Sequence, residues 1–275
     1  MLEIPESKTI AKQVGSTLTG HTIKTAQANA SPHRFAFYHG DPAEYGSLLT
    51  GKTITGAQAY GGMVEIAAGD VRLLFGDGAN LRYIRSGEAL PAKHQLLVSF
   101  DDGSALVCTV QMYGGIWAFW EDEFDNPYYD VARRKPSPLS NAFDAAYFGG
   151  IVSAAPASLS TKGLLATEQR IPGLGNGVLQ DILLYARVNP RTKVSALSDS
   201  EIEALYESIK TTLATMTAQG GRDTEKDLFG QSGGYKTKLS SKKAGMLCPQ
   251  CGGPVVKQAY MGGSVYFCSK CQPLR

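Results

Sequence analysis

Four cysteines in the last thirty residues limit the fold of this chain more than any other feature. They are arranged as C-x2-C, sixteen residues and C-x2-C: Cys248, Cys251, Cys268 and Cys271. This spacing is typical of a tetrahedral zinc site with four thiolate ligands, in which each pair lies on a tight turn. Val255-Val256 and Val265-Tyr266-Phe267 flank Met261-Gly262-Gly263, which predicts a β-hairpin between the pairs. A segment this small has little core of its own, and zinc contributes about 10–16 kcal/mol of apparent binding free energy to such units.

Disulfides and redox-active C-x2-C motifs are the alternatives to a zinc site. We favour zinc because the opening residues Met1 to Ser7 do not resemble an export signal, and cytosolic thiols stay reduced. Four thiolates fill all four coordination positions, so the expected zinc ion is structural rather than catalytic. The fifth cysteine, Cys108, lies in an apolar run and is expected to be a buried core residue. The chain has no apolar run long enough for a membrane span, and we expect a cytoplasmic protein.

The net charge of +2 is unevenly distributed. Residues 228–275 contain seven Lys or Arg and no Asp or Glu, which leaves −5 for the residues before them. A basic tail fits contact with a polyanion such as nucleic acid, and a solvated lysine face is the alternative. With 275 residues, the chain is expected to form two domains and an appendage.

Residues 1–130 predict an opening helix and then a β-sandwich. The helix is expected over Glu6 to Leu18, with Ile10, Val14 and Leu18 at four-residue spacing and Gly20 after its end. The strand-like runs are short and separated by turn residues, as is typical of a sandwich: 52–54, 64–66, 71–75, 81–84, 96–100 and 105–110. The last two runs flank Asp101-Asp102-Gly103-Ser104, a hairpin signal.

A helical domain is predicted over residues 131–227, after a linker at Tyr128 to Ser140 that contains Arg133-Arg134-Lys135-Pro136. Its helices are expected at 142–152, 160–167, 177–187 and 199–218. The last of them begins with a capping-box sequence, Ser198 to Glu201. Residues 228–275 form the third unit, a basic and mobile loop over 228–246 followed by the zinc ribbon. The fold class expected is therefore α+β with several domains.

A glycine-rich turn before an apolar helix is a second candidate for a functional site. It runs from Arg170 to Asn176 and leads into the helix predicted for 177–187. Such a turn presents unpaired backbone N–H groups at the positive end of a helix, where a phosphate binds well. A dinucleotide fold is disfavoured, because no buried strand precedes the turn and its glycines do not follow G-x-G-x-x-G. An ordinary turn between helices stays open for this segment alone.

Three motifs together resemble one known family. Gly173-Leu174-Gly175-Asn176, followed by a helix and Asn189-Pro190, resembles the helix-two-turn-helix of the formamidopyrimidine-DNA glycosylase / endonuclease VIII family. The ribbon from Cys248 to Gln272 and the opening segment Leu2 to Glu6 resemble that family's last and first motifs, in the family's order. The resemblance covers essentially the whole chain. It implies that Asn176, assisted by backbone amides such as that of Gly175, holds a DNA phosphate at the damaged nucleotide.

The resemblance also implies a catalytic role for the first residues. In the family, the amine of an N-terminal proline attacks C1′ of the damaged nucleotide and forms a Schiff base, which leads to strand cleavage. An α-amino group suits this step because its pKa of about 8 leaves much of it uncharged. This chain keeps the family's carboxylates as Glu3 and Glu6 but has Leu2 where the proline would stand. Methionine is normally retained before leucine, so we expect the Met1 amine to act beside these two carboxylates.

The residues expected to contact DNA also depart from the family pattern. Gly263 stands where the family's zinc hairpin has a phosphate-binding arginine, and residues 59–63 lack an expected lysine. Two segments that reach into DNA in the family align with 74–77 and 111–114. Met112 and Tyr113 are therefore candidate apolar wedges, with a place in the sandwich core or rim as the alternative. Basic residues before the ribbon are expected to supply part of the missing charge unless they are simply solvated: Lys236, Lys238, Lys242 and Lys243.

Two functions are compatible with these features. The first is a monomeric base-excision-repair enzyme, a DNA glycosylase and AP lyase that acts on oxidised or ring-opened bases in damaged or abasic duplex DNA. The second is a catalytically silent module of the same fold that binds DNA or RNA. Because Leu2 stands where the family has its catalytic proline, the two functions differ in whether the Met1 amine can act as the nucleophile.

Overall fold

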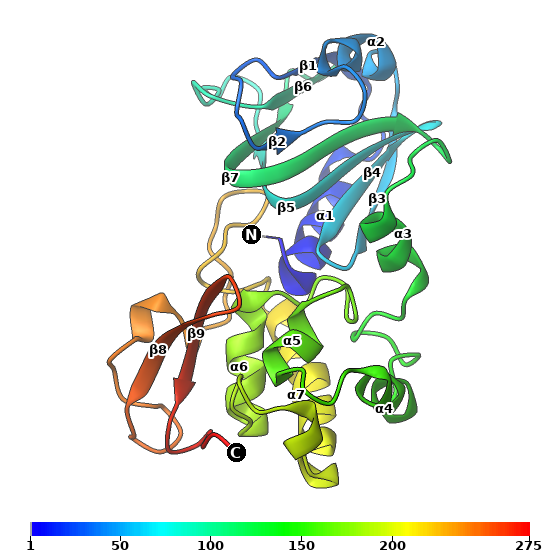
Figure 1. The fold of residues 1–275 in the computed structure, drawn as a ribbon. Coiled ribbons are helices and arrows are strands. Elements are labelled where there is room, and N and C mark those ends of the chain that lie inside the picture. Colours follow the sequence, from blue (N-terminus) through cyan, green and yellow to red (C-terminus); the bar gives the residue numbers. More distant parts are fainter. Residues whose placement is uncertain (1) are drawn as a thin grey trace.

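A β-sheet forms most of one lobe of the molecule (Figure 1). In the computed structural model, which describes residues 2–275, its strands are hydrogen-bonded in the order β1-β6-β7-β5-β4-β3, and β2 pairs with β7. An antiparallel bridge between Thr22 and Thr53 lies where the two outer strands, β1 and β3, begin. The predicted β-rich N-terminal lobe is confirmed. The strands are β1 (Ile23–Ala28), β2 (Ala36–Phe37), β3 (Ile54–Tyr60), β4 (Met63–Ala68), β5 (Val71–Ile84), β6 (Leu96–Phe100) and β7 (Ala105–Trp120).

The strands β5 and β7 are much longer than predicted. The runs 71–75 and 81–84 are one strand, and the run 105–110 continues to Trp120, so these boundaries were wrong. The strand β5 stays paired with β7 through a bend at Asp77, where φ is 53° and the register shifts. Gly78 follows the bend and lies against the carbonyl of Tyr113. A polar residue next to a glycine looks like a turn in the sequence, although here it is a bulge inside a continuous strand.

Two strands at the edges of the sheet were missed or misplaced. The strand β1 has one buried residue, Ile23, and the rest of its side chains are partly or fully exposed. It therefore lacks the alternation that marks a half-buried strand. The run predicted at 52–54 lies before β3, which begins at Ile54 and extends to Tyr60.

The helix α1 (Ile4–Leu18) packs against β3 and β4. It begins two residues before the predicted start, and Pro5 lies in its first turn, where proline is tolerated. Ile10, Val14 and Leu18 are buried in the core of the sandwich, as their spacing predicted. Ile4 instead belongs to the core of the helical lobe, so α1 contributes to both cores.

The second lobe consists of helices around a core formed mainly by α6 and α7. The helix α7 (Asp199–Ala218) has the predicted bounds, and the capping box of Ser198 and Glu201 is present. The predicted linker is partly helical, because Asn126 caps α3 (Pro127–Arg134). The remaining helices are α2 (Tyr45–Leu49) in the sandwich lobe, and α4 (Ala145–Ala154), α5 (Thr161–Ala166) and α6 (Asn176–Ala186) in the helical lobe.

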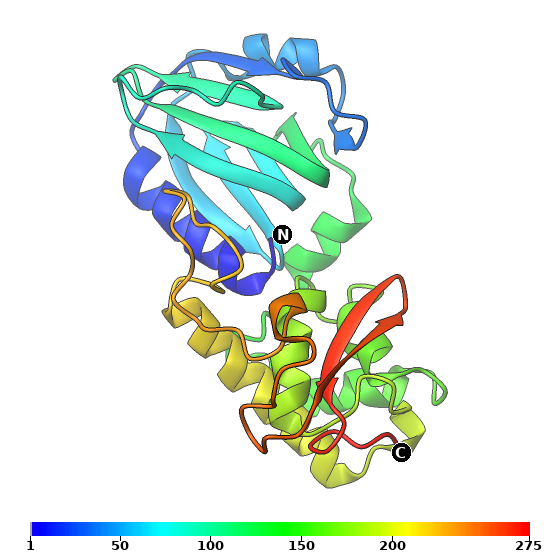
Figure 2. The same cartoon turned by 90° about the vertical axis from the view of Figure 1, so that its left-hand side faces the viewer.

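The C-terminal segment runs from the sandwich back to the helical lobe (Figure 2). The amide of Leu228 donates to Gln13 and its carbonyl accepts from Tyr83, whereas Leu239 is buried next to α6. The segment 228–246, predicted as mobile, is therefore held by contacts with both lobes. The ribbon consists of β8 (Val255–Tyr260) and β9 (Gly263–Cys268). Short 3-10 turns occur at Pro42–Glu44, Val194–Ala196 and Ser241–Lys243.

Within residues 2–275, no helix combines the length and the apolar character needed to cross a bilayer. The predicted domain boundaries at 130 and 227 stay predictions, since Ile4 and Leu228 each contribute to a core outside their predicted unit.

Candidate functional site

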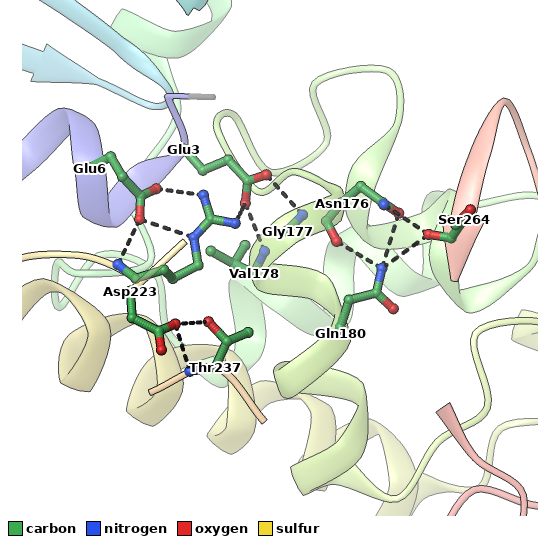
Figure 3. A network of polar contacts seen from close by, with 10 residues as sticks. Glu3, Glu6, Asn176, Gly177, Val178, Gln180, Asp223, Thr237 and Ser264 are labelled. Carbon is green, nitrogen blue, oxygen red and sulfur yellow. Dashed lines mark hydrogen bonds and ion pairs between the residues drawn. The ribbon is translucent and has the colours of Figure 1, made fainter. Parts of the chain in front are cut away.

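Glu3 lies where the two lobes meet (Figure 3). Its Oε1 accepts a hydrogen bond from the backbone N–H of Gly177 at 2.9 Å, and its Oε2 accepts one from Val178 at 2.8 Å. Both amides belong to the first turn of α6, so the carboxylate lies at the positive end of that helix. Glu3 is only 2% exposed. Burial raises the pKa of Glu3, against the lowering effect of Arg222 and of the two amides.

Glu6 is paired with Arg222, which follows α7. Oε1 of Glu6 accepts from the backbone N–H and from Nε of Arg222, both at 3.0 Å, and Oε2 accepts from Nη2 at 2.8 Å. Nη1 of Arg222 lies 3.6 Å from Oε2 of Glu3. Arg222 was not predicted as a site residue, because it lies in the short stretch between the helix expected at 199–218 and the basic segment that begins at residue 228. Two acidic side chains three residues apart at the start of a buried helix were the available signal that a cation was needed.

The residue Leu2, also a candidate catalytic position, is buried in the sandwich core. Its backbone N–H donates to the carbonyl of Asp77 at 2.9 Å, at the bend of β5. A peptide nitrogen is not a nucleophile, so Leu2 can position its neighbours but cannot attack a sugar. Met1, the predicted source of the amine, lies outside the described residues.

Asn176, the predicted phosphate ligand, is the first residue of α6 and faces the ribbon (Figure 3). Its Nδ2 donates to the carbonyl of Ser264 in β9 at 2.9 Å, and its Oδ1 accepts from Gln180 at 3.2 Å. Gln180 in turn accepts from the amide of Tyr266 at 2.9 Å. Gly175, the N-cap residue of α6, precedes Asn176 with an extended backbone. The structure thus brings Asn176 and Glu3 to the same end of α6.

Lys162 is a further charged residue that the sequence analysis did not select. It is 4% exposed, and its Nζ donates to the carbonyl of Tyr260 at 2.6 Å, in the turn of the ribbon. A Cβ atom at Gly263 would lie 3.6 Å from this Nζ and 3.8 Å from Nδ2 of Asn176. Gly263, which stands where the family has an arginine, is therefore next to the ammonium group of Lys162 and the amide group of Asn176.

The two candidate wedge residues are on the surface. Met112 is 71% exposed and Tyr113 is 38% exposed, which excludes the sandwich core and is compatible both with a wedge and with a place on the sandwich rim. Burial raises the pKa of Tyr113, and the charges of Asp77 and Glu3 add to that effect, which indicates that its ring is near the N-terminal carboxylate. In the other aligned segment, Leu74 and Phe75 are buried and only Asp77 is exposed.

The candidate lysines lie on the segment before the ribbon. Lys236 is exposed, with its Nζ 3.9 Å from Oδ2 of Asp223. The Nζ of Lys238 lies 5.7 Å from the ring centre of Tyr235, while its backbone N–H donates to the buried Asp181 of α6. The backbone of this basic segment is therefore held at Lys238, whose side chain is half-buried, whereas the side chain of Lys236 is exposed.

The four cysteines form a cluster that can hold one metal ion. All four sulfur atoms lie within 4.8 Å of one another. Sγ of Cys248 is 3.9 Å from that of Cys271, and Sγ of Cys251 is 3.5 Å from that of Cys268. Ligands about 2.3 Å from a zinc ion in a tetrahedron are about 3.8 Å apart, so the cluster fits zinc. Cys108 is separate and fully buried in β7, as predicted.

Gln272 anchors the ribbon to the helical lobe. Its side-chain oxygen accepts from the amide of Cys268, and its Nε2 donates to the carbonyl of Val188, each at 2.9 Å. Its own carbonyl accepts from Nδ2 of Asn189 at 2.9 Å. The metal cluster is thereby fixed relative to α6.

Two surface cavities of about 390 and 440 Å³ lie on the sandwich, the first next to Tyr129 and the second next to His39. Neither is lined by Glu3 or Asn176. The groups described above at the end of α6 are therefore separate from both cavities.

Comparison with curated proteins shows similarity over the full length. The chain is 26% identical over 281 residues to the formamidopyrimidine-DNA glycosylase of Geobacillus kaustophilus, with 99% of this chain and 100% of the relative covered. It is 27% identical over 288 residues to that of Lactobacillus delbrueckii subsp. bulgaricus, with 99% of each covered. No family model matches the chain.

Two solved structures have a similar fold over nearly the full length of the chain. A complex of a mutant of the Lactococcus lactis FPG protein with Fapy-dG-containing DNA superposes with a TM-score of 0.84 at 25% identity, covering 98% of this chain and 99% of that chain. The MutM (Fpg) protein of Thermus thermophilus superposes with a TM-score of 0.81 at 22% identity, covering 99% of each chain.

Proposed function

Since this chain belongs to the formamidopyrimidine-DNA glycosylase / endonuclease VIII family, we propose that it is a DNA glycosylase of base excision repair. The observation that carries the proposal is the placement of Glu3 and Asn176 at one helix end, between the sandwich and the ribbon. The relative from Lactococcus lactis was solved with DNA that contains Fapy-dG. Ring-opened and oxidised bases, together with abasic sites, are therefore the substrates proposed for this chain.

The proposed reaction begins with an amine at the start of the chain, which we assign to Met1. Its nitrogen forms a bond to C1′ of the damaged nucleotide while the bond from C1′ to the base breaks, and the base leaves with a proton. The nitrogen lone pair then opens the bond from C1′ to O4′, which gives an imine and leaves O4′ to take up a proton. We assign Glu3 to that proton transfer: its carboxylate, buried at the junction where the sugar would lie, takes up the proton that the amine nitrogen loses after the attack and delivers it to O4′.

The proposed DNA contacts follow from the same geometry. Asn176 and the backbone at Gly175 would bind the phosphate next to the lesion. Met112 and Tyr113, both exposed, would fill the space that the displaced base leaves. Lys236 and Lys238 would contact phosphates from the segment before the ribbon, with a salt-dependent contribution to affinity.

The proposed metal is one structural zinc ion. Cys248, Cys251, Cys268 and Cys271 would hold it as thiolates, and zinc would supply cross-links rather than chemistry. The chain's own residues, above all Gln180 and Gln272, attach the metal-bearing hairpin to α6.

Borohydride trapping on DNA with an abasic site tests the proposal. Hydride adds to the imine carbon and converts the intermediate into a stable amine, so we expect a complex with the combined mass of protein and DNA. Peptide mapping of the complex should place the modified amine at Met1. Glu3→Gln should reduce the rate of trapping about 100-fold or more, while Glu203→Gln in the exposed part of α7 serves as the control.

The results of this experiment separate the two functions considered. Absence of an adduct between about pH 6 and pH 9, where an α-amine changes charge, would refute the proposed chemistry. If the protein then still binds the abasic duplex, it acts as a silent binding module.

A further inference from the structure

Arg222 occupies a buried position between the two carboxylates of the N-terminal segment. It is 3% exposed and lies directly after Gly221, whose φ of 97° turns the chain from the end of α7 toward α1. Its backbone N–H, Nε and Nη2 all donate to Glu6, and its Nη1 lies 3.6 Å from Glu3. One guanidinium therefore faces two carboxylates, which come from the opposite end of the sequence.

The absence of a side chain at Gly177 makes room for this guanidinium. A Cβ atom built on Gly177 would lie 1.6 Å from Nη1 of Arg222 and 2.9 Å from Oε1 of Glu3. Real Cβ atoms essentially never come within 3.0 Å of such atoms. Glycine at 177 and arginine at 222 are thus a matched pair, although they are far apart in the sequence.

We propose that Arg222, admitted by Gly177, is a positioning residue that holds Glu3 as an ionised carboxylate at the end of α6. The inference rests on the proposed function, in which Glu3 moves a proton at the sugar. It concerns a pair of residues that none of the motifs described above includes.

The charges that face Glu3 support this role. Burial disfavours the ionised form of Glu3, and the neighbouring Glu6 disfavours it further. Tyr113 is also near enough to interact with Glu3. Arg222 is the charged group that opposes these effects, assisted by the amides of Gly177 and Val178. Loss of the guanidinium therefore removes the main electrostatic support of the Glu3 carboxylate.

A first experiment measures the charge of Glu3 without any need for catalysis. The side-chain carboxyl carbon of Glu3 is followed by NMR through a pH titration of the full-length protein, its Arg222→Lys form and its Arg222→Gln form. An opposite charge within about 4–6 Å lowers a carboxyl pKa by about 1–3 units, so Arg222→Gln should raise the midpoint by that amount. Arg222→Lys keeps a cation and should shift the midpoint less. Equal midpoints in the three proteins would overturn the proposal.

A second experiment uses Gly177→Ala, which leaves Arg222 in the sequence but takes its space. We expect this variant to raise the Glu3 midpoint in the same direction as Arg222→Gln. Gly15→Ala is the matched control, because Gly15 lies in α1 with no atom within 4 Å of its added Cβ, and it should leave the midpoint unchanged. An unchanged midpoint in Gly177→Ala would show that the two residues are not a matched pair and would overturn that part of the inference.

The pH dependence of borohydride trapping then connects the pair to the reaction. If ionised Glu3 is required, the acidic limb of the rate profile should move to higher pH in Arg222→Gln by the shift that NMR measures. If the unmodified protein is trapped but the acidic limb of Arg222→Gln does not move, the role of Arg222 is refuted and the proposed function stands. No trapping by the unmodified protein, together with a shifted midpoint, would refute the proposed function while the control of the Glu3 charge stands.

Discussion

Replacement of Glu6 by glutamine tests whether the buried ion pair stabilises the junction between the lobes. The side chains of Glu6 and Arg222 are each 4% exposed, so solvent does little to screen or replace their interaction. Glutamine has nearly the same shape as glutamate but carries no charge. Its oxygen can still accept from the backbone N–H and Nε of Arg222, whereas its amide group would face the Nη2 that Oε2 of Glu6 now accepts from.

The expected loss of stability is about 3 kcal/mol. A hydrogen bond to a charged group contributes about 1.5–3 kcal/mol, and breaking a buried ion pair costs about 3–5 kcal/mol. The lower end applies here, because Glu3 still lies 3.6 Å from the guanidinium and partly balances its charge. For a chain of this size, each kcal/mol lowers the melting temperature by about 2–4 °C, which gives a decrease of about 6–12 °C.

Denaturant unfolding of the zinc-loaded protein, followed by circular dichroism, measures this difference, and a thermal melt provides a second estimate. Glu203→Gln, an exposed change in α7, should alter the free energy of unfolding by no more than about 0.5 kcal/mol. A decrease below about 1 kcal/mol for Glu6→Gln would contradict the reasoning, because it would mean that the cost of burying the two charges nearly cancels their attraction.

Three further predictions concern the ribbon and the DNA. Removal of the metal by a chelator should unfold the hairpin of β8 and β9 while the sandwich keeps its structure, since about 10–16 kcal/mol of apparent binding free energy is lost from the hairpin. Hydrogen exchange of the backbone amides in the hairpin and in the sandwich measures this, and continued protection of the hairpin amides in the metal-free protein would contradict the prediction. Asn176→Ala should weaken binding to abasic duplex about 10-fold by fluorescence anisotropy, and equal affinity would remove Asn176 from the interface. The double change Lys236→Gln and Lys238→Gln should lower the slope of log affinity against log salt concentration by up to about 1.8, and an unchanged slope would show that these lysines are only solvated.

Sequence reasoning was most successful where local signals and tertiary packing agree. The bounds of α7 were predicted because its capping box and the spacing of its apolar residues both act within one helix. The cysteine spacing likewise led to the metal cluster, since four ligands near one point are a strong geometric constraint. The strand β5 was divided in two because the bulge at Asp77 has the composition of a turn, and only its pairing with β7 shows that the strand continues.

The candidate site was predictable only in part. Glu3, Glu6 and Asn176 were found because each lies in a motif that is continuous in the sequence. Arg222 and Lys162 were not found, because their partners are distant in sequence and the contacts exist only after the lobes have come together. The anchoring of the segment 228–246 was missed for the same reason, since Asp181 accepts its backbone amides from within α6.

The position of Gln272 has a practical consequence for anyone who shortens or tags this protein. A version that stops after Cys271 would keep all four thiolates and could still take up its metal. It would lose the amide that connects the second knuckle to the turn after α6, so that the hairpin would be attached only through β9 and the ribbon turn, by Asn176, Gln180 and Lys162. Metal content alone would not distinguish such a protein from the full-length one, so truncated versions should be compared by their affinity for DNA.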